Sequence, residues 1–146
     1  MRAVERLPAN RSVSSFAKPA PTTPCSRACS TFEVDSSHSH LTAEFHGVSG
    51  EALRDAALLG GLLIAAASAA GFSMIAVPTV KKHAGDGVSA VLLMPSAHIT
   101  LHSIPDRGTL LFDIVGPASH DFRKALDVFA RRLSARDIKS DIRGRG

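Results

Sequence analysis

The chain has 146 residues, enough for one domain around a single hydrophobic core, and its 45% apolar content is ordinary for a globular protein. Its net charge of +4 gathers near the two ends, and the absence of Trp and Tyr removes the usual stacking platforms, so we expect no nucleic-acid partner. Two cysteines, Cys25 and Cys29, exclude a disulfide framework or a four-ligand zinc site and favour a reduced, cytoplasmic setting.

The first 37 residues are predicted to form a disordered leader. They hold four of the eight prolines, many Ser and Thr, and no sustained hydrophobic period, so they cannot bury enough surface to fold alone. Their arginines and single early acid, Glu5, also suit an organelle transit peptide, but the apolar stretch of a secretory signal is missing. The folded domain is therefore expected over residues 38–146.

The stretch 56–80 carries no charged residue, and its length could cross a bilayer, which takes about 20 apolar residues. Its residue pattern changes midway, however. The start Ser49-Gly50-Glu51 and the alanine-rich sequence up to Ala70 favour a helix with Gly71 at its C-terminal cap, whereas Phe72–Val77 favours a strand. We therefore predict a helix and a strand here, and no membrane span.

Turn signals divide the rest of the chain into further elements. The predicted strands are Val88–Met94, the alternating segment His98–His102, Thr109–Val115 ending at Gly116-Pro117, and a final short strand Asp137–Ile142. Ser119 is the expected N-cap of a helix with an apolar face formed by Phe122, Ala125, Leu126, Phe129 and Leu133. This order predicts an α+β fold, a two-layer sandwich in which an antiparallel sheet carries helices packed on one face.

Chemistry is suggested by one predicted strand. His98 and His102 share a face because alternate strand residues point the same way, and Ser96 and Thr100 join them if the strand is regular. A hydroxyl beside imidazoles suits acid–base chemistry or activation of a nucleophile. A metal site would require a third ligand, which the neighbouring sequence does not supply. Surface histidines on an exposed sheet would give the same pattern. Hydrolase and phosphate-loop motifs are missing.

Residues 87–106 read GVSAVLLMPSAHITLHSIPD. This segment resembles the G-V-S-x-V-x-x-x-E-S-H-x-x-x-H-T-W-P-E run of the bacterial and archaeal S-adenosylmethionine decarboxylases. The likeness continues without a gap from His40, through Phe45-His46-Gly47, to Phe112-Asp113-Ile114. The chain is thus similar to a divergent member of that family.

The resemblance implies a particular chemistry. In that family a serine hydroxyl attacks the preceding carbonyl, the resulting ester eliminates, and the new chain begins with a pyruvoyl group. That ketone is the cofactor that acts as an electron sink while S-adenosylmethionine loses carbon dioxide, a step of spermidine synthesis. The implied partners are S-adenosylmethionine or a related ligand and a second subunit, in a homodimer or in a heterodimer with a paralogue.

Carried over residue by residue, the resemblance gives a mixed site. Ser89 matches a serine that assists processing, His98 the histidine after the cut, His102 the histidine of the elimination, His83 a phenylalanine that stacks on adenine, and Asp106 a glutamate. The self-processing serine, however, is replaced by Ala97 and the catalytic-acid cysteine by Pro117. We therefore expect an uncut chain, and two alternatives stay open: an active decarboxylase that draws its pyruvoyl group from Ser96, and a non-catalytic regulatory or partner subunit.

Overall fold

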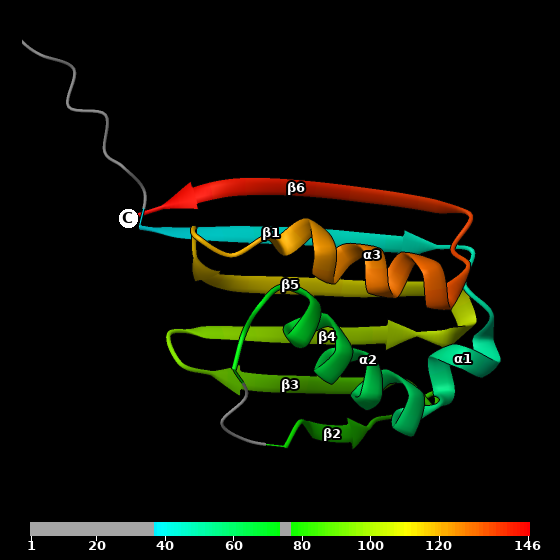
Figure 1. Cartoon of the computed structure of the whole chain (residues 1–146). Helices are drawn as coiled ribbons and strands as arrows, with labels where there is room; N and C mark the ends of the chain where they lie inside the picture. The colour runs from blue at the N-terminus through cyan, green and yellow to red at the C-terminus, as the bar shows by residue number, and fades with distance from the viewer. Residues whose placement is uncertain (1–36, 74–76) are drawn as a thin grey trace, which may run out of the picture. The chain divides into compact units, whose positions relative to one another are not determined.

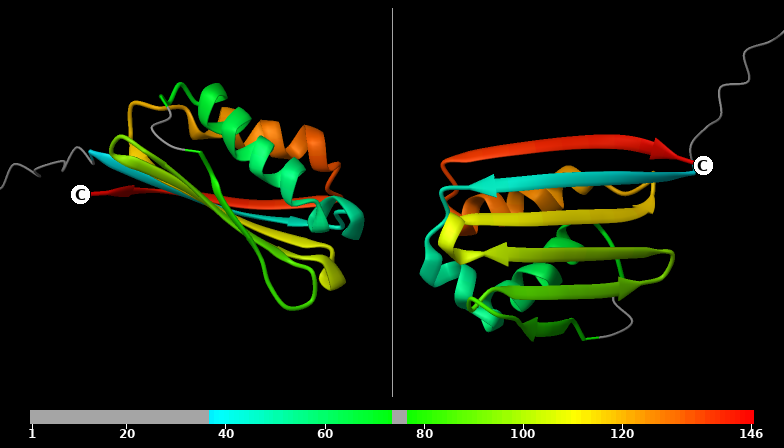
Figure 2. Two further views of the ribbon diagram at one scale, coloured as in Figure 1. Left: turned by 90° about the horizontal axis from the view of Figure 1, so that it is seen from below. Right: turned by 180° about the vertical axis from the view of Figure 1, so that it is seen from behind.

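The computed structural model describes residues 37–73 and 77–146, which form one antiparallel sheet with helices packed on one face (Figures 1 and 2). The strands are β1 (His38–His46), β2 (Thr79–Lys82), β3 (Val88–Met94), β4 (Ala97–Ile104), β5 (Thr109–Pro117) and β6 (Asp137–Arg145). The helices are α1 (Gly50–Arg54), α2 (Ala56–Ala69) and α3 (Phe122–Leu133), with a turn of 3-10 helix, η1 (Pro105–Arg107), before β5. The expected α+β sandwich is confirmed.

The strand order in the sheet is β2-β3-β4-β5-β1-β6, and every neighbouring pair is antiparallel. Strands β2 to β5 follow one another along the chain as a meander. Strand β1 then lies between β5 and β6, where Leu41 is opposite both Ile114 and Ile142. The first strand is therefore held on both sides by strands from the C-terminal half of the chain (Figure 1).

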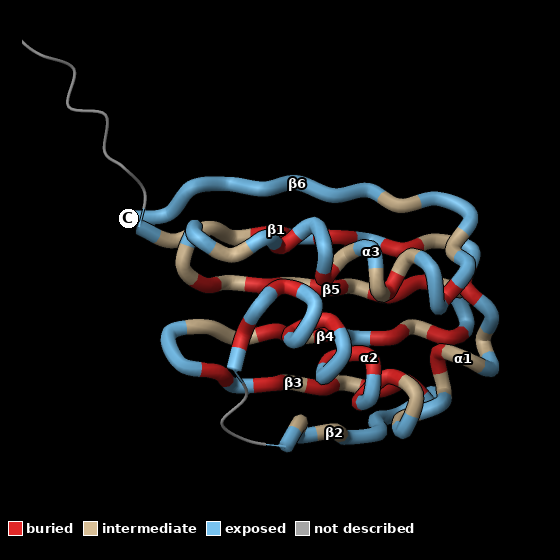
Figure 3. Tube along the Cα trace, in the orientation of Figure 1, coloured by how far each residue is buried: buried red, intermediate tan, exposed pale blue. Residues whose placement is uncertain are grey.

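The core lies between the sheet and the helices (Figure 3). Alternate residues of each central strand are buried, as the two-residue period of a strand requires. Three phenylalanines from β1, β5 and α3 meet there: the ring centroids of Phe112 and Phe129 are 4.7 Å apart, and those of Phe45 and Phe112 are 6.4 Å apart. The predicted apolar face of α3 is confirmed, because Phe122, Ala125, Phe129 and Leu133 are buried.

The predicted Ala-rich helix is interrupted at Asp55. Ser49 caps α1 as expected, since its hydroxyl accepts from the Ala52 N–H at 3.2 Å. The Asp55 carboxylate then accepts from the N–H groups of Ala57 and Leu58, both at 3.0 Å, and starts α2. Over residues 37–73 and 77–146, no helix combines the length and the apolar content needed to cross a membrane.

The predicted strand Phe72–Val77 is not found at the residues of this segment that the structure describes. Residues 74–76 lie outside the described residues, and Phe72, Ser73 and Val77 belong to no strand; β2 begins only at Thr79. The reason is the end of α2, where Gly71 adopts a φ of +85° and the Phe72 N–H donates to the Ala67 carbonyl at 2.9 Å. The buried Phe72 ring therefore closes the helix as the apolar residue after its capping glycine.

Two boundaries also differ from expectation. The N-cap of α3 is Asp121, which accepts from the Arg123 N–H at 3.2 Å, because the residues after Pro117 turn first and the His120 N–H donates to the Pro117 carbonyl at 3.1 Å. Strand β6 continues to Arg145 because it pairs with β1 along its whole length. Apart from Ser37, the predicted leader lies outside the described residues.

Candidate functional site

The helices leave one face of the sheet uncovered, which we call the open face (Figure 2). The side chains that alternate with the buried ones point to it, and five of the chain's seven histidines are among them. These histidines are His38, His40 and His46 on β1, and His98 and His102 on β4. The prediction that His98, Thr100 and His102 share a face is confirmed, since the residues between them, Ile99 and Leu101, are buried.

Ser89 and His102 form a short polar contact on this face. The two residues are directly opposite each other on β3 and β4, and the Ser89 Oγ lies 2.7 Å from the His102 Nδ1. Such a contact lets a hydroxyl and an imidazole exchange a proton. The structure thus brings together two residues that are 13 positions apart in the sequence, while their role in processing stays a prediction.

Ala97 points to the opposite side of the sheet. It begins β4 opposite Met94, and its half-buried methyl group packs between β4, β5 and Phe72. A Cβ built on Gly116 would lie 2.8 Å from the Ala97 Cβ and 3.2 Å from the Phe72 Cζ, so only glycine leaves room beside Ala97. His102 is five residues further along β4, about 17 Å away by the rise of a strand.

Ser96 is not on the face with His98 and His102, so this part of the prediction is wrong. Met94 pairs with Ala97, which makes Pro95 and Ser96 the two central residues of a tight hairpin turn. Ser96 is exposed with a φ of +57°, and a proline followed by a positive φ is the pattern of a type II turn. The turn interrupts the two-residue period, which therefore starts only at Ala97.

Pro117 and the two predicted substrate-binding residues lie at different ends of the sheet. Pro117 ends β5 opposite His38, and its ring carries no acidic proton. His83 and Asp106 lie beyond the ends of β2 and β4. The exposed His83 packs against Gly87 with its Nδ1 3.1 Å from the Ala84 carbonyl oxygen, and Asp106 pairs with Arg54 at 3.0 Å.

A further group of open-face residues was missed by the sequence analysis. The Arg145 Nη2 lies 3.2 Å from the His40 Nδ1, and the His40 Nε2 lies 3.4 Å from the Asp113 Oδ1. Because a guanidinium only donates, Nδ1 accepts and the Nε2–H donates to Asp113. A hollow of about 610 Å³ lies beside these three hydrogen-bonded side chains. It is lined by His38, His40, His98, Thr100, Asp113, Val115, Arg145 and Gly146. The sequence signal that could have predicted this group is the alternation of polar residues His38, His40 and Thr42, which places all three on one face of β1.

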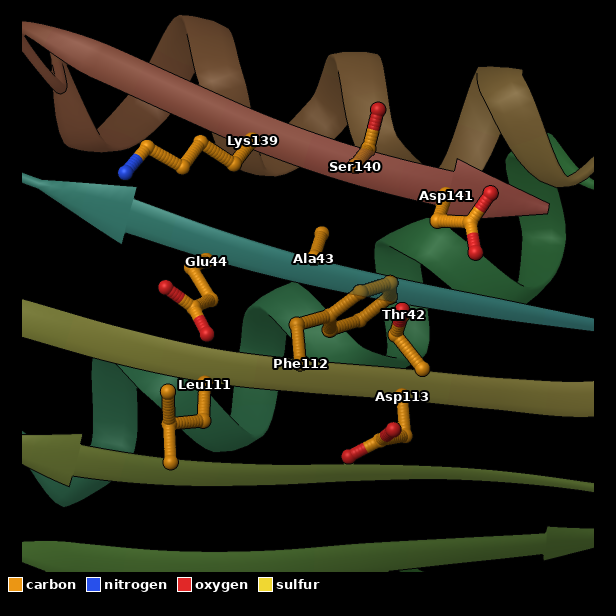
Figure 4. A pocket seen from close by; sticks show the side chains of 9 residues that line it. All are labelled: Thr42, Ala43, Glu44, Leu111, Phe112, Asp113, Lys139, Ser140 and Asp141. Carbon is orange, nitrogen blue, oxygen red and sulfur yellow. The ribbon is translucent and has the colours of Figure 1, made fainter.

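A second hollow of about 400 Å³ lies across β5, β1 and β6 (Figure 4). Its charged side chains are Glu44, Asp113, Lys139 and Asp141. In the described residues, no group of three or more His, Cys, Asp or Glu is arranged to hold a metal ion. The open face therefore offers hydrogen-bonding and proton-transfer groups of both charges over a wide surface.

Comparison with known proteins places the fold and then the family of this chain. The structure is similar to the crystal structure of the adenosylmethionine decarboxylase from Aquifex aeolicus, with a TM-score of 0.68 and 23% identity over 76% of this chain and 92% of that one. The sequence model of the S-adenosylmethionine decarboxylase family matches residues 39–146. The chain belongs to this family.

Relatives that are named for two different activities match part of this sequence. The S-adenosylmethionine decarboxylase proenzyme of Methanococcus maripaludis is 28% identical over 109 residues, which are 70% of this chain and 88% of the relative. The arginine decarboxylase proenzyme of Aeropyrum pernix is 32% identical over 100 residues, which are 66% of this chain and 75% of the relative. Both relatives are named as proenzymes, that is, as precursors.

Proposed function

We propose that this protein is a family member that does not cut itself and therefore acts without a pyruvoyl group. The observation that carries the proposal is Ala97 at the position of the self-processing serine. A methyl group cannot attack the carbonyl of the preceding residue, and it cannot be eliminated to a ketone.

The residues present do not fit the family's cofactor. A pyruvoyl group is made from the chain's own serine, and this chain has neither that serine nor, at Pro117, a proton donor. Ser89 and His102 are retained at 2.7 Å, which supports descent from a processing ancestor. We assign no catalytic step to a pyruvoyl group here.

Ser96 is the one alternative source of the cofactor. Its hydroxyl is exposed in a hairpin turn, where no hydrogen bond to the described residues holds it against the Pro95 carbonyl. This exposed position favours the uncut chain over an active decarboxylase built on Ser96.

The ligand that we propose is S-adenosylmethionine, bound without turnover. The support is the retained open face with His98, His102 and Ser89, together with the family and its relatives that are named for this substrate. L-Arginine is the natural comparison compound, because another relative is named for it. His83 and Asp106 stay in the proposal as residues for the adenosyl group.

We also propose that a second copy covers the open face, giving a cytoplasmic homodimer. The Ser89–His102 pair and the end of the sheet at Ala97 are separated within one chain. Two copies stacked face to face with antiparallel strands would bring these two regions together, and they would also cover Leu93, whose exposed fraction is 58%. A paralogue that retains the serine could take the place of the second copy, and this chain would then be its non-catalytic partner.

Intact-mass measurement on the purified full-length protein tests the central point. A single species at 15.3 kDa is expected. Two fragments that meet between Pro95 and Ser96, abolished by Ser96→Ala, would establish the active alternative. Release of labelled carbon dioxide from carboxyl-labelled S-adenosylmethionine and L-arginine should stay at background.

Two further measurements test the ligand and the assembly. S-adenosylmethionine should raise Tm and L-arginine should not, because only a ligand that binds the folded state stabilises it. Absence of any thermal shift would favour the regulatory subunit. Sedimentation should show a dimer, and Leu93→Glu, which places charge on the open face, should yield monomers with an unchanged fold; a monomer in the unmodified protein would refute the proposed homodimer.

A further inference from the structure

The outer face of α2 carries no charge although it faces solvent. No Asp, Glu, Lys or Arg occurs between Asp55 and Lys81, and yet only one side of α2 packs on the sheet. The exposed residues of the helix are Ala57, Gly61, Ile64, Ala65, Ser68 and Ala69. A helix that is apolar all round is normally buried all round, whereas a surface helix carries polar residues outside. Packing in the core explains the apolar residues on the buried side of α2, but it does not explain the lack of charged residues on the exposed side.

Gly61 adds an independent observation. A glycine inside a helix is less favourable than alanine by about 0.5–1 kcal/mol, so its presence usually reflects a close contact. The neighbouring Gly60 has such a contact, because a Cβ there would lie 3.2 Å from the Val80 Cγ2. A Cβ on Gly61 would meet nothing within 4 Å. Within the described chain, therefore, no contact explains Gly61, and it leaves the backbone of α2 open to close approach from outside.

The adjacent edge of α3 is cationic. A groove of about 220 Å³ runs between the two helices and is lined by Ala69 of α2 and by Lys124, Asp127, Val128 and Arg131 of α3. No ion pair within the described residues involves Arg131, and the Lys124 Nζ is 4.0 Å from the Asp121 carboxylate. The floor of the groove is apolar, and its rim carries two cationic side chains, Lys124 and Arg131, against one carboxylate, Asp127.

We propose that the outer face of α2, together with this edge of α3, is the docking surface for an amphipathic helix with acidic flanks from a partner protein. Apolar residues of the partner lie over Gly61 and Ala65, where the small side chains allow close helix packing. Its carboxylates reach Lys124 and Arg131. The partner is thus defined by shape and by charge, and its site is on the side of the sandwich away from the open face.

Charge and shape favour this occupant over two others. A second copy packed with α2 antiparallel on α2 would bring the basic edges of α3 against each other, which is unfavourable. A lipid bilayer would receive little apolar surface, because Ile64 is the only large apolar side chain exposed on α2 and its exposed fraction is 36%. A membrane-binding helix would instead present several large apolar residues.

Two synthetic helical peptides with the same leucine face test the proposal, one flanked by glutamates and the other by lysines. Each is titrated into the full-length, isotope-labelled protein, and its Kd is measured by fluorescence anisotropy. We expect only the acidic peptide to bind saturably and to shift amide resonances of α2 and α3. Equal binding of both peptides, no saturable binding, shifts confined to the open face, or a preference for phosphatidylserine vesicles would overturn the proposal.

Matched variants make the test specific. Arg131→Glu, at the groove, should weaken binding of the acidic peptide about tenfold, whereas Arg132→Glu, the next residue of α3 and outside the groove, should change it less than about twofold. Gly61→Ala should weaken binding at least about fivefold while it raises Tm by about 2–4 °C, because alanine is the better helix former. Unchanged binding in Gly61→Ala, or equal effects of the two arginine variants, would refute the assigned surface.

Discussion

Replacing Ala97 by serine restores the hydroxyl that self-processing requires and changes nothing else in the site. The new Oγ has room because Gly116 has no side chain beside it. In the proposed homodimer, the Ser89–His102 pair of the second copy supplies proton transfer, while Pro117 has no proton to give. We therefore expect Ala97→Ser to cut itself partially before residue 97 and to decarboxylate S-adenosylmethionine poorly.

The size of each effect follows from the surroundings of Ala97. An unpaired buried hydroxyl costs about 1–3 kcal/mol, and the half-buried position puts the cost at the low end, near 1 kcal/mol. For a domain of this size the loss lowers Tm by about 4 °C, so the variant stays folded. A missing general acid lowers turnover by about 10²- to 10⁴-fold, so decarboxylation should be rescued by the double variant Ala97→Ser/Pro117→Cys.

Intact-mass spectrometry over a time course measures the cutting, and labelled carbon dioxide measures turnover. Ala118→Ser, which adds the same hydroxyl at an exposed position nearby, is the matched control and should stay whole. Efficient turnover by Ala97→Ser alone would show that the role assigned to Pro117 is wrong. A variant that stays whole would show that the Ser89–His102 pair no longer supports processing.

Three other substitutions test parts of the structure. In the Ala97→Ser background, Ser89→Ala removes the partner of His102 and should slow self-cutting by about tenfold or more on the same mass assay. Ser103→Ala should lower the free energy of unfolding by about 2–4 kcal/mol in urea denaturation, because the fully buried Ser103 Oγ accepts from the Val88 N–H and donates to the Leu53 carbonyl, both at 2.7 Å; the exposed Ser68→Ala should stay within about 0.5 kcal/mol. Asp55→Ala removes the cap of α2 and should lower the free energy of unfolding, measured by thermal unfolding, by about 1 kcal/mol. Asp55→Asn, whose side-chain oxygen can still accept the capping hydrogen bonds, should lower it less.

Helices and strands of this fold are predicted well from the sequence where a single local pattern, such as strand alternation or a helix cap, decides the structure. The alternation from His98 to His102 is enough to place these side chains on one face, and the Ser49 cap needs only its own neighbours. The predicted strand at Phe72 failed because the capping of α2 competes for the same residues and wins through a backbone hydrogen bond. The pattern of aromatic and β-branched residues cannot reveal that competition.

The candidate site is less predictable because its parts are distant in sequence. The contact of Ser89 with His102 depends on the length of the turn at Pro95 and Ser96, which also removes Ser96 from the strand. His40 and Asp113 meet only because β1 is inserted beside β5, a pairing that no local pattern contains. The resemblance to a family supplies roles for some of these positions, but it does not supply their distances.

The place of β1 in the sheet sets an order of events for folding. As the chain leaves the ribosome, β2 to β5 can pair in succession, but β1, which is made first, must wait for β5 on one side and for β6 on the other. Until then the edge of β5 is unpaired, and such long-range pairing is slow. Loss of the last nine or so residues would remove β6 and leave β1 as an exposed edge, so aggregation during synthesis is the expected cost of C-terminal truncation.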